Sequence, residues 1–209
     1  MMAFSSEFQT ELLDLMRWRR DVRRFRSDPV DDALLRDCLE AMRLAPSVGL
    51  SEPWRVISVQ SETARDAMLA NFQAENADAL ADYDGERAET YAGLKLSGMR
   101  EAPVQLAVFC DEDTSKGGGL GVRTMTEMRR YSVVTAIMNL WLFARAQGLG
   151  VGWVSILDAE QAKRDLDAPD GWALVAYLCV GWPEETHTDP ELQRAGWEQR
   201  SDALEVEVR

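Results

Sequence analysis

The chain has 209 residues, 46% of them hydrophobic, and carries a formal net charge of −13 with a pI near 4.6. This length and composition are typical of one large domain with a substantial core, and no apolar run reaches the roughly 18–20 residues of a membrane span. The acidity argues against nucleic acid as the main partner, because phosphate backbones require broad positive surfaces. The first ten residues lack the basic start and apolar stretch of a signal peptide. We therefore expect a single cytoplasmic domain over residues 1–209, with neither nucleic acid nor a membrane as partner.

Cysteine and histidine usage excludes several kinds of site. Cys38, Cys110 and Cys179 are odd in number and far apart, which argues against a disulfide framework and against a CxxC metal site. We expect three small buried hydrophobes in a reducing cytosol. His187 is the only histidine and sits in a polar loop, so neither a Ser-His-Asp triad nor a histidine-rich metal site is expected. We predict no bound metal.

The first elements lead into a concentration of positive charge. Apolar residues at helical spacing predict a helix over residues 8–18. It runs into residues 17–26, here called the arginine run, which contain six of the 23 lysines and arginines and one acid, Asp21. Residues 19–25 are predicted to form the helix end and an extended turn. Such uneven positive charge in an acidic protein indicates a compact anion, such as one phosphate group.

A second helix and a structured loop follow. Pro29 breaks the chain, and Asp31 or Asp32 can cap a helix that stops at Ala45-Pro46. Residues 45–54 form a loop with two prolines and a glycine, which leads into a short strand over residues 54–60.

The middle of the chain is predicted to be helical but poor in core residues. Ser61 begins a helical region that reaches about Met99, and Asp84-Gly85 divides it. Because apolar positions are sparse, residues 74–95, here called the excursion, are expected to form a solvent-facing excursion or lid.

The second half alternates strands and helices. Strands are predicted over residues 103–110, 151–157 and 172–180, the last central in its sheet because it is almost entirely apolar. Residues 131–147 form the most apolar helix, buried and possessing a second face for a partner subunit, and Asp158 caps a short helix to Leu166. Residues 111–121 are glycine-rich but lack the Gly-Lys-Ser/Thr order of a P-loop, so a mobile linker is favoured. Residues 182–209, here called the arm, complete the chain.

This order of elements predicts an α+β domain with a central mixed sheet wrapped by helices. It lacks the regular βαβ alternation and the GxGxxG motif of a dinucleotide-binding fold.

Two motifs together resemble the FMN-dependent nitroreductase superfamily. One is Arg-Arg-Asp-Val-Arg at residues 19–23, and the other is Ala-Pro-Ser at 45–47, with a glycine shortly after and Pro-Trp at 53–54. Within the superfamily the chain is similar to the 5,6-dimethylbenzimidazole synthase family. Asp21 replaces the usual serine of the Arg-Arg-Ser-x-Arg motif, Gly49 stands where reductases commonly carry Asn, and segments 150–155 and 189–200 match that family.

The resemblance implies a nitroreductase-like fold, a homodimer and an FMN site at the subunit interface. It also implies that reduced FMN is the substrate. FMN reacts with O2 as co-substrate and is broken into 5,6-dimethylbenzimidazole, the lower ligand of cobalamin, and erythrose 4-phosphate. A flavin reductase or free reduced flavin would be the supplier, and no metal would take part.

The resemblance also implies the site residues. Asp21 and Ser155 are the expected catalytic residues. The expected contacts of FMN are Arg19, Arg20, Asp21, Val22, Arg23, Pro46, Ser47, Gly49, Lys95, Gly152 and Arg200. For Arg17, Arg24 and Arg26 we favour solvated or dimer-facing positions instead.

Asp21 has two interpretations. A carboxylate beside several arginines is expected to have a depressed pKa and to be ionised at neutral pH. As a base it takes protons from the ribityl chain or the flavin intermediate. The alternative is that it only neutralises its neighbours or caps a turn.

Four other residues carry specific expectations. Ser155, on an apolar strand, is expected to hydrogen-bond the ribityl hydroxyls or the flavin ring, and the alternative is a satisfied core hydroxyl. Gly49 lets backbone approach the ring and leaves a pocket for O2. Lys95, on the helix after the lid, reaches the anionic edge of reduced flavin or lies on the surface. Arg200 closes over the phosphate from the arm.

Two other functions stay open from the sequence alone. An ordinary FMN-dependent NAD(P)H nitroreductase or quinone reductase would retain its flavin, and Asp21 and Gly49 are the features against it. A non-catalytic flavin-binding protein is the other alternative, against which Asp21 argues weakly.

Overall fold

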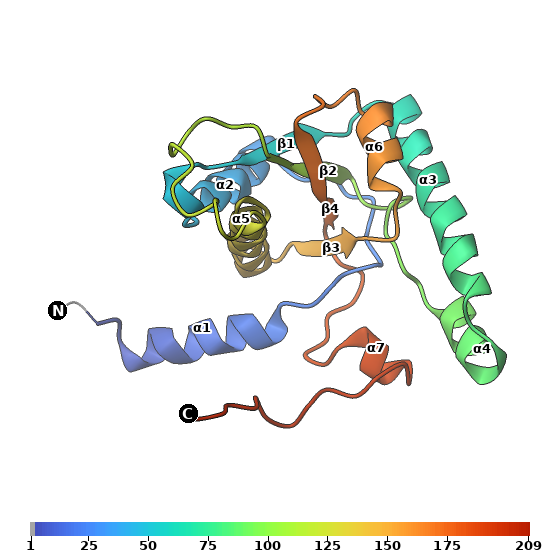
Figure 1. Ribbon diagram of the computed structural model, residues 1–209. Coiled ribbons are helices and arrows are strands. Elements are labelled where there is room, and N and C mark those ends of the chain that lie inside the picture. The colour runs from blue at the N-terminus through green and yellow to red at the C-terminus, as the bar shows by residue number, and fades with distance from the viewer. Residues whose placement is uncertain (1–2) are drawn as a thin grey trace.

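Four strands form one sheet in the computed structural model, which describes residues 3–209 (Figure 1). Their order across the sheet is β1-β2-β4-β3 and every pairing among them is antiparallel. The sheet is therefore antiparallel and not mixed as predicted; an isolated parallel bridge between Asp21 and Val151 lies outside the named strands. The strands are β1 (Trp54–Ser58), β2 (Val104–Asp111), β3 (Gly150–Val154) and β4 (Trp172–Gly181). β4 is therefore central, as its apolar sequence predicts.

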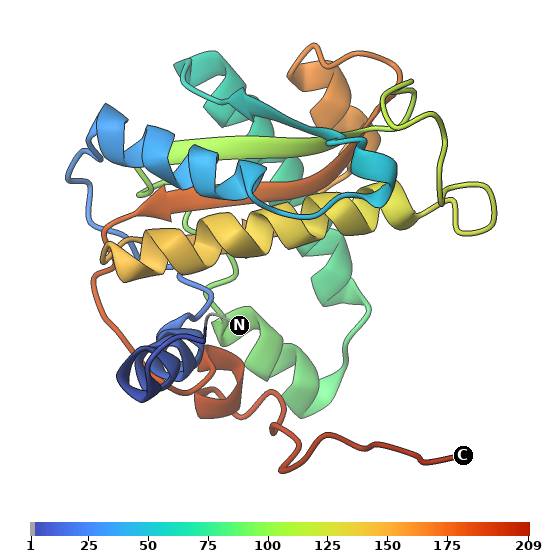
Figure 2. The same ribbon diagram turned by 90° about the vertical axis from the view of Figure 1, so that its left-hand side faces the viewer.

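Helices cover both faces of this sheet, with α2 and α5 on one face and α3 and α6 on the other (Figures 1 and 2). The helices are α1 (Ser6–Trp18), α2 (Asp32–Arg43), α3 (Glu62–Ala81), α4 (Gly85–Gly93), α5 (Met128–Ala146), α6 (Ala159–Asp165) and α7 (Glu191–Arg194), together with a 3-10 turn, η1 (Val48–Leu50). The predicted α+β architecture is confirmed.

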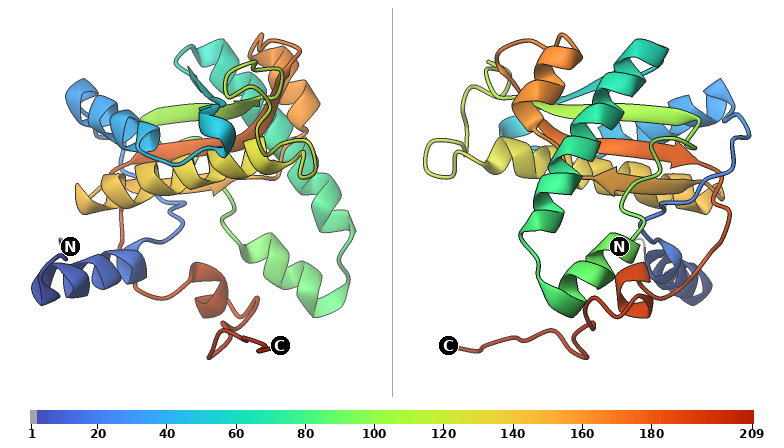
Figure 3. Two further views of the ribbon diagram at one scale, coloured as in Figure 1. Left: turned by 60° about the vertical axis from the view of Figure 1, so that its left-hand side comes forward. Right: turned by 90° about the vertical axis from the view of Figure 1, so that its right-hand side faces the viewer.

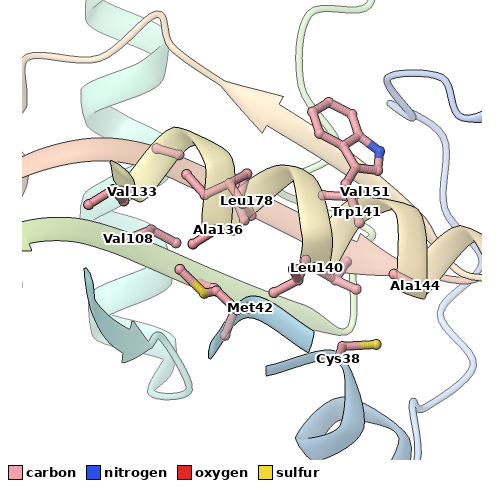
Figure 4. Packing of buried hydrophobic residues seen from close by; sticks show 14 of the residues in the cluster. Cys38, Met42, Val108, Val133, Ala136, Leu140, Trp141, Ala144, Val151 and Leu178 are labelled. Carbon is pink, nitrogen blue, oxygen red and sulfur yellow. The ribbon is translucent and has the colours of Figure 1, made fainter. Parts of the chain in front are cut away.

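The two-residue period of a strand divides the core into two clusters. From β2, Leu106 and Val108 point toward α2 and α5, whereas Ala107 and Phe109 point toward α3 and α6. Figure 4 shows the first cluster, in which Val108 packs with side chains of both helices. The three cysteines are free and buried, as expected.

Side-chain caps begin several helices where the sequence predicts. Asp31 accepts hydrogen bonds from the amides of Ala33 and Leu34 at the start of α2, and Ser61 and Asp158 cap α3 and α6. The helical region from Ser61 divides at Asp84-Gly85, but it ends at Gly93 and not near Met99.

α5 begins at Met128, earlier than expected, and its core-facing side is fully buried. Its opposite side is not covered by this chain, because Val134 and Met138 remain exposed. α1 contributes no buried residue and, with α4 and α7, lies to one side of the sheet (Figure 3). No helix among residues 3–209 combines the length and apolarity that crossing a membrane requires.

Candidate functional site

The arginine run lies alongside β3. α1 ends at Trp18 and the backbone becomes extended. Asp21 forms the parallel bridge with Val151, and the Val22 amide donates to the Val151 carbonyl at 3.0 Å. Further on, Phe25 forms an antiparallel bridge with Pro183. The run is therefore a partial strand along the edge of the sheet, as the predicted extended turn suggests.

Two glycines of β3 allow this close approach. A Cβ at Gly152 would lie 2.1 Å from the Val22 carbonyl oxygen, and one at Gly150 would lie 2.8 Å from Val22 Cγ2. Residues two apart on a strand share a face, so both positions must lack a side chain for the run to lie there. Gly152 thus faces the backbone of Val22, and its role in the site is to let Asp21 take its place.

The Asp21 carboxylate is held by two donors. Oδ1 accepts from the Trp153 amide at 2.8 Å and Oδ2 accepts from Arg23 Nε at 2.9 Å. The side chain is 31% exposed. Burial raises the pKa of the Asp21 carboxyl, although the Arg23 charge and the Trp153 N–H act in the opposite direction. The expected depressed pKa is therefore wrong, because desolvation of the carboxylate outweighs its single arginine partner. A fixed carboxyl whose pKa is raised above the ordinary aspartate value is a stronger proton acceptor, once ionised, than an ordinary aspartate.

Three arginines, Arg19, Arg20 and Arg200, gather at the start of the run and repel one another. Burial lowers the pKa of Arg19, and the charge of Arg200 lowers it further while Asp21 raises it. The pKa of Arg20 is likewise lowered by burial and then by Arg19 and Arg200. Within residues 3–209 none of the three forms an ion pair, and Arg20 donates instead to the Thr188 carbonyl at 2.9 Å. A phosphate would relieve this repulsion and can accept from several guanidinium groups at once.

The remaining arginines of the run have local acidic partners. Arg17 pairs with Asp14 at 2.8 Å, Arg24 with Glu191 at 2.7 Å, and Arg26 with Asp28 at 3.2 Å. Arg17 and Arg26 are exposed, as we favoured, whereas Arg24 is partly buried and its ion pair ties the run to α7.

Lys95 and Ser155 do not lie where the sequence suggested. Lys95 follows α4 in a segment without helical structure, and its ammonium pairs with Glu101. Its link to the run is its carbonyl, which accepts from Arg23 Nη1 at 3.2 Å. Ser155 is exposed and lies one residue beyond β3, so it is neither on an apolar strand nor a core hydroxyl.

The loop of Pro46, Ser47 and Gly49 lies at the other end of α5 (Figure 2). The Val48 amide donates to Ser132 Oγ at 3.0 Å, whereas Arg19 stacks on Trp141 at 4.7 Å. The loop's contact nearest to Trp141 is at Thr135, whose Oγ1 donates to the Pro46 carbonyl at 3.3 Å, and the six positions of helix between them span about 9 Å along the axis. One chain therefore does not bring the two sequence motifs together.

Gly49 is explained by packing within its own chain. Its φ is +57°, and a Cβ would lie 2.8 Å from the Leu120 carbonyl oxygen in the glycine-rich loop. The backbone here approaches Leu120 closely, so the expected pocket for O2 is not formed at Gly49 by this chain alone.

Sequence reasoning missed Arg145. Its side chain is buried at 4% exposure, has no acidic partner among residues 3–209, and stacks on Trp18 with 3.5 Å between the guanidinium carbon and the ring centroid. Burial lowers its pKa. Trp141 lies one turn earlier on α5 and carries Arg19, so two reciprocal stacks fix the point where the run leaves α1. The only sequence signal is the four-residue spacing of Trp141 and Arg145.

Comparisons with known proteins agree with this geometry. The nitroreductase family model matches residues 16–182. A 5,6-dimethylbenzimidazole synthase of Rhodospirillum rubrum is 54% identical over 94% of this chain and 93% of its own length. Another from Rhodobacter capsulatus is 48% identical over 95% of this chain and 96% of its own. Among solved structures, an iodotyrosine deiodinase bound to FMN and 3-iodo-L-tyrosine shares the fold, with a TM-score of 0.71 at 23% identity over 95% of this chain and 97% of that one. The chain belongs to the nitroreductase family and, within it, to the branch of the 5,6-dimethylbenzimidazole synthases.

Proposed function

We propose that this protein is a 5,6-dimethylbenzimidazole synthase, which uses O2 to fragment reduced FMN into 5,6-dimethylbenzimidazole and erythrose 4-phosphate. The observation that carries the proposal is the Asp21 carboxyl, fixed between the Trp153 amide and Arg23 at a position where other nitroreductases commonly have serine. The two relatives at 54% and 48% identity support the same activity. A cytoplasmic location and supply by a flavin reductase or free reduced flavin are part of this proposal.

The arginine cluster fits the phosphate of FMN. Arg19, Arg20 and Arg200 are mutually repelling cations, and a doubly charged phosphate beside them offsets that repulsion. Arg23 is held by Asp21 and by the Lys95 carbonyl, so its position is fixed independently of any ligand. FMN would lie with its phosphate against this cluster.

Asp21 holds and moves the proton in this proposal. Reduced FMN supplies the electrons that O2 accepts, and the carbon skeleton that is broken. Asp21 accepts a proton from the bound molecule while Trp153 and Arg23 keep its oxygens in place. The exposed Ser155 hydroxyl follows β3 directly and orients the bound molecule. The one histidine, His187, is distant from Ser155 in sequence and pairs with Glu185 at 3.2 Å, so we assign Ser155 positioning and not nucleophilic attack.

The site is completed by a second copy of the chain. The loop with Pro46, Ser47 and Gly49 is separated from the arginine run in one chain, so in our proposal it lines the site of the other protomer. The apolar residues left exposed on α1 and α5, among them Phe8, Leu13, Met16, Val134 and Met138, supply a surface for a homodimer.

Hybrid dimers test this arrangement. We expect Asp21→Asn and Ser47→Tyr each to be inactive, the second because its bulk blocks the loop. When equal amounts of the two variants are unfolded and refolded together, about half of the dimers are hybrids. Each hybrid has one site with both changes and one site with neither, so about a quarter of all sites are intact. Product from the mixture, measured against each variant refolded alone, checks this. A mixture as inactive as its parts would place all site residues in one chain.

The function is tested with purified protein, excess reduced FMN and air. Chromatography should detect 5,6-dimethylbenzimidazole in proportion to the FMN lost. Flavin recovered intact would refute the proposal. Steady NAD(P)H consumption on a nitro compound would instead identify an ordinary reductase, and unchanged bound flavin without such consumption would identify a flavin-binding protein.

A further inference from the structure

An aromatic cluster joins the arm to the excursion. The rings of Tyr83 and Tyr91 stack at 5.1 Å between centroids, and Trp197 approaches them edge-on at 5.4 and 5.9 Å. The guanidinium carbon of Arg87 lies 3.7 Å from the Trp197 ring, and Arg87 Nη1 donates to the Trp197 carbonyl at 2.9 Å. Tyr91 is buried, and its hydroxyl donates to Asn76 Oδ1 at 2.9 Å. Trp197 is therefore held by edge-on contacts with the two tyrosines, by a guanidinium over its ring face and by a hydrogen bond to its carbonyl.

This cluster is the main attachment of the last part of the arm. α7 ends at Arg194, and the residues after it form no helix or strand. The exposed residues 201–209 give the arm no further anchor. In this stretch Trp197 makes the aromatic and hydrogen-bond contacts to the excursion, and Arg200 follows beside Arg20.

Arg200 lies three residues beyond Trp197. An extended chain of three residues spans about 10 Å at most, so the position of Trp197 limits where the Arg200 guanidinium can lie. Arg200 is close enough to Arg19 and Arg20 for its charge to lower the pKa of both. The excursion also continues into Lys95, whose carbonyl holds Arg23. Arg200 and Arg23 are thereby both tied to the excursion, the first through Trp197 and the second through the Lys95 carbonyl.

We propose that Trp197 is a positioning residue for Arg200: its seat among Tyr83, Tyr91 and Arg87 sets the arm so that Arg200 completes the phosphate site. This inference rests on the proposed binding of FMN. It adds that the excursion and the arm act on the phosphate as one unit, although neither Trp197 nor the tyrosines touch the ligand.

The test compares FMN with riboflavin, which lacks the phosphate. Each oxidised flavin is titrated by fluorescence against the intact chain and Trp197→Ala. We expect the dissociation constant for FMN to rise about tenfold, the loss of one charge-assisted contact, and that for riboflavin to stay unchanged. Trp197→Phe retains an aromatic ring in the cluster and should recover most of the affinity. In an Arg200→Met background, Trp197→Ala should have no further effect.

The control is Trp182→Ala, which also removes a tryptophan beside an arginine, Arg26 at 6.0 Å, but away from Arg200. It should leave both affinities unchanged. Equal losses for FMN and riboflavin, or an additive loss in the Arg200→Met background, would overturn the inference. If Trp197→Ala does not fold, Arg87→Met removes one contact of Trp197. It is judged by the same two changes, those in the dissociation constants for FMN and for riboflavin relative to the intact chain. If the intact chain makes product but Trp197→Ala does not change the dissociation constant for FMN, only this inference fails. If the intact chain makes no 5,6-dimethylbenzimidazole from reduced FMN, the proposed function fails as well.

Discussion

Asp21→Asn is expected to bind FMN normally and to form at least about a hundredfold less 5,6-dimethylbenzimidazole, because a positioned acid–base group typically contributes 10²–10⁴ in rate. The amide retains an acceptor for the Trp153 N–H but takes up no proton at neutral pH. The arginines that we propose to hold the phosphate are unchanged. Flavin titration and product chromatography on the same preparation separate binding from turnover. The matched control is Asp28→Asn, since Asp28 also pairs with an arginine of the run, Arg26, but on the surface.

The pH dependence of turnover carries the same assignment. Only the ionised carboxylate accepts a proton, so product formation rises with pH as Asp21 ionises. Because burial raises its pKa, this rise lies above the ordinary range of an aspartate. Single-turnover rates with pre-reduced FMN should rise with pH in the intact chain and should not show this rise in Asp21→Asn. A normal rate in Asp21→Asn, or the same rise with pH in both proteins, would show that Asp21 is not the base.

Stability should follow the opposite direction with pH. The folded state holds the Asp21 proton more tightly than the unfolded state, so this group stabilises the fold at low pH. That contribution is lost as pH rises through the raised pKa. The melting temperature of Asp21→Asn relative to the intact chain should therefore increase with pH over that interval.

Gly152→Ala is expected to lower both stability and activity. The new Cβ would lie 2.1 Å from the Val22 carbonyl oxygen, and a backbone atom cannot yield as a side chain does. Overpacking of this kind costs about 1–3 kcal/mol, or about 2–4 °C in melting temperature for each kcal/mol in a chain of this size. The displaced run also carries Asp21 away from the Trp153 amide, so we expect product formation to fall by about a hundredfold.

Gly93→Ala is the control, because nothing lies within 4 Å of a Cβ at that position. It should leave the rate unchanged and should not lower the melting temperature, since alanine is the better helix former in α4. If Gly152→Ala retained both, the run would not depend on its contact with β3, and the geometry assigned to Asp21 would be wrong.

Local features of the fold were predictable because they depend on neighbouring residues. Asp31, Ser61 and Asp158 begin helices as caps, since a short polar side chain satisfies the free amides of the next turn. The apolar run of β4 marks a central strand because both its faces are covered. The end of the helical region from Ser61, which lies at Gly93 and not near Met99, and the start of α5 at Met128 were misplaced, because helix ends depend on packing that is not local.

The site was predictable in its residue types but not in its geometry. The clustered arginines indicate an anion from the sequence alone. The raised pKa of Asp21 depends on how deeply the sheet edge buries it, which no local pattern records. The need for a glycine at position 152 becomes visible only in the structure, where the Val22 backbone lies against it. Arg145 and Trp197 were missed or left unexplained because their partners, Trp18 for one and Tyr83 and Tyr91 for the other, lie more than a hundred residues away.

The partial strand formed by Asp21 to Phe25 has a consequence for solubility. β3 is an edge strand, and an uncovered edge offers free amides and carbonyls to the strands of other molecules. The arginine run covers part of that edge with its own backbone and surrounds it with positive charge. The segment that we propose to bind the phosphate is thus also the segment that shields the sheet from intermolecular pairing. Variants that detach the run should therefore aggregate on heating, and added FMN should delay the onset of their light scattering.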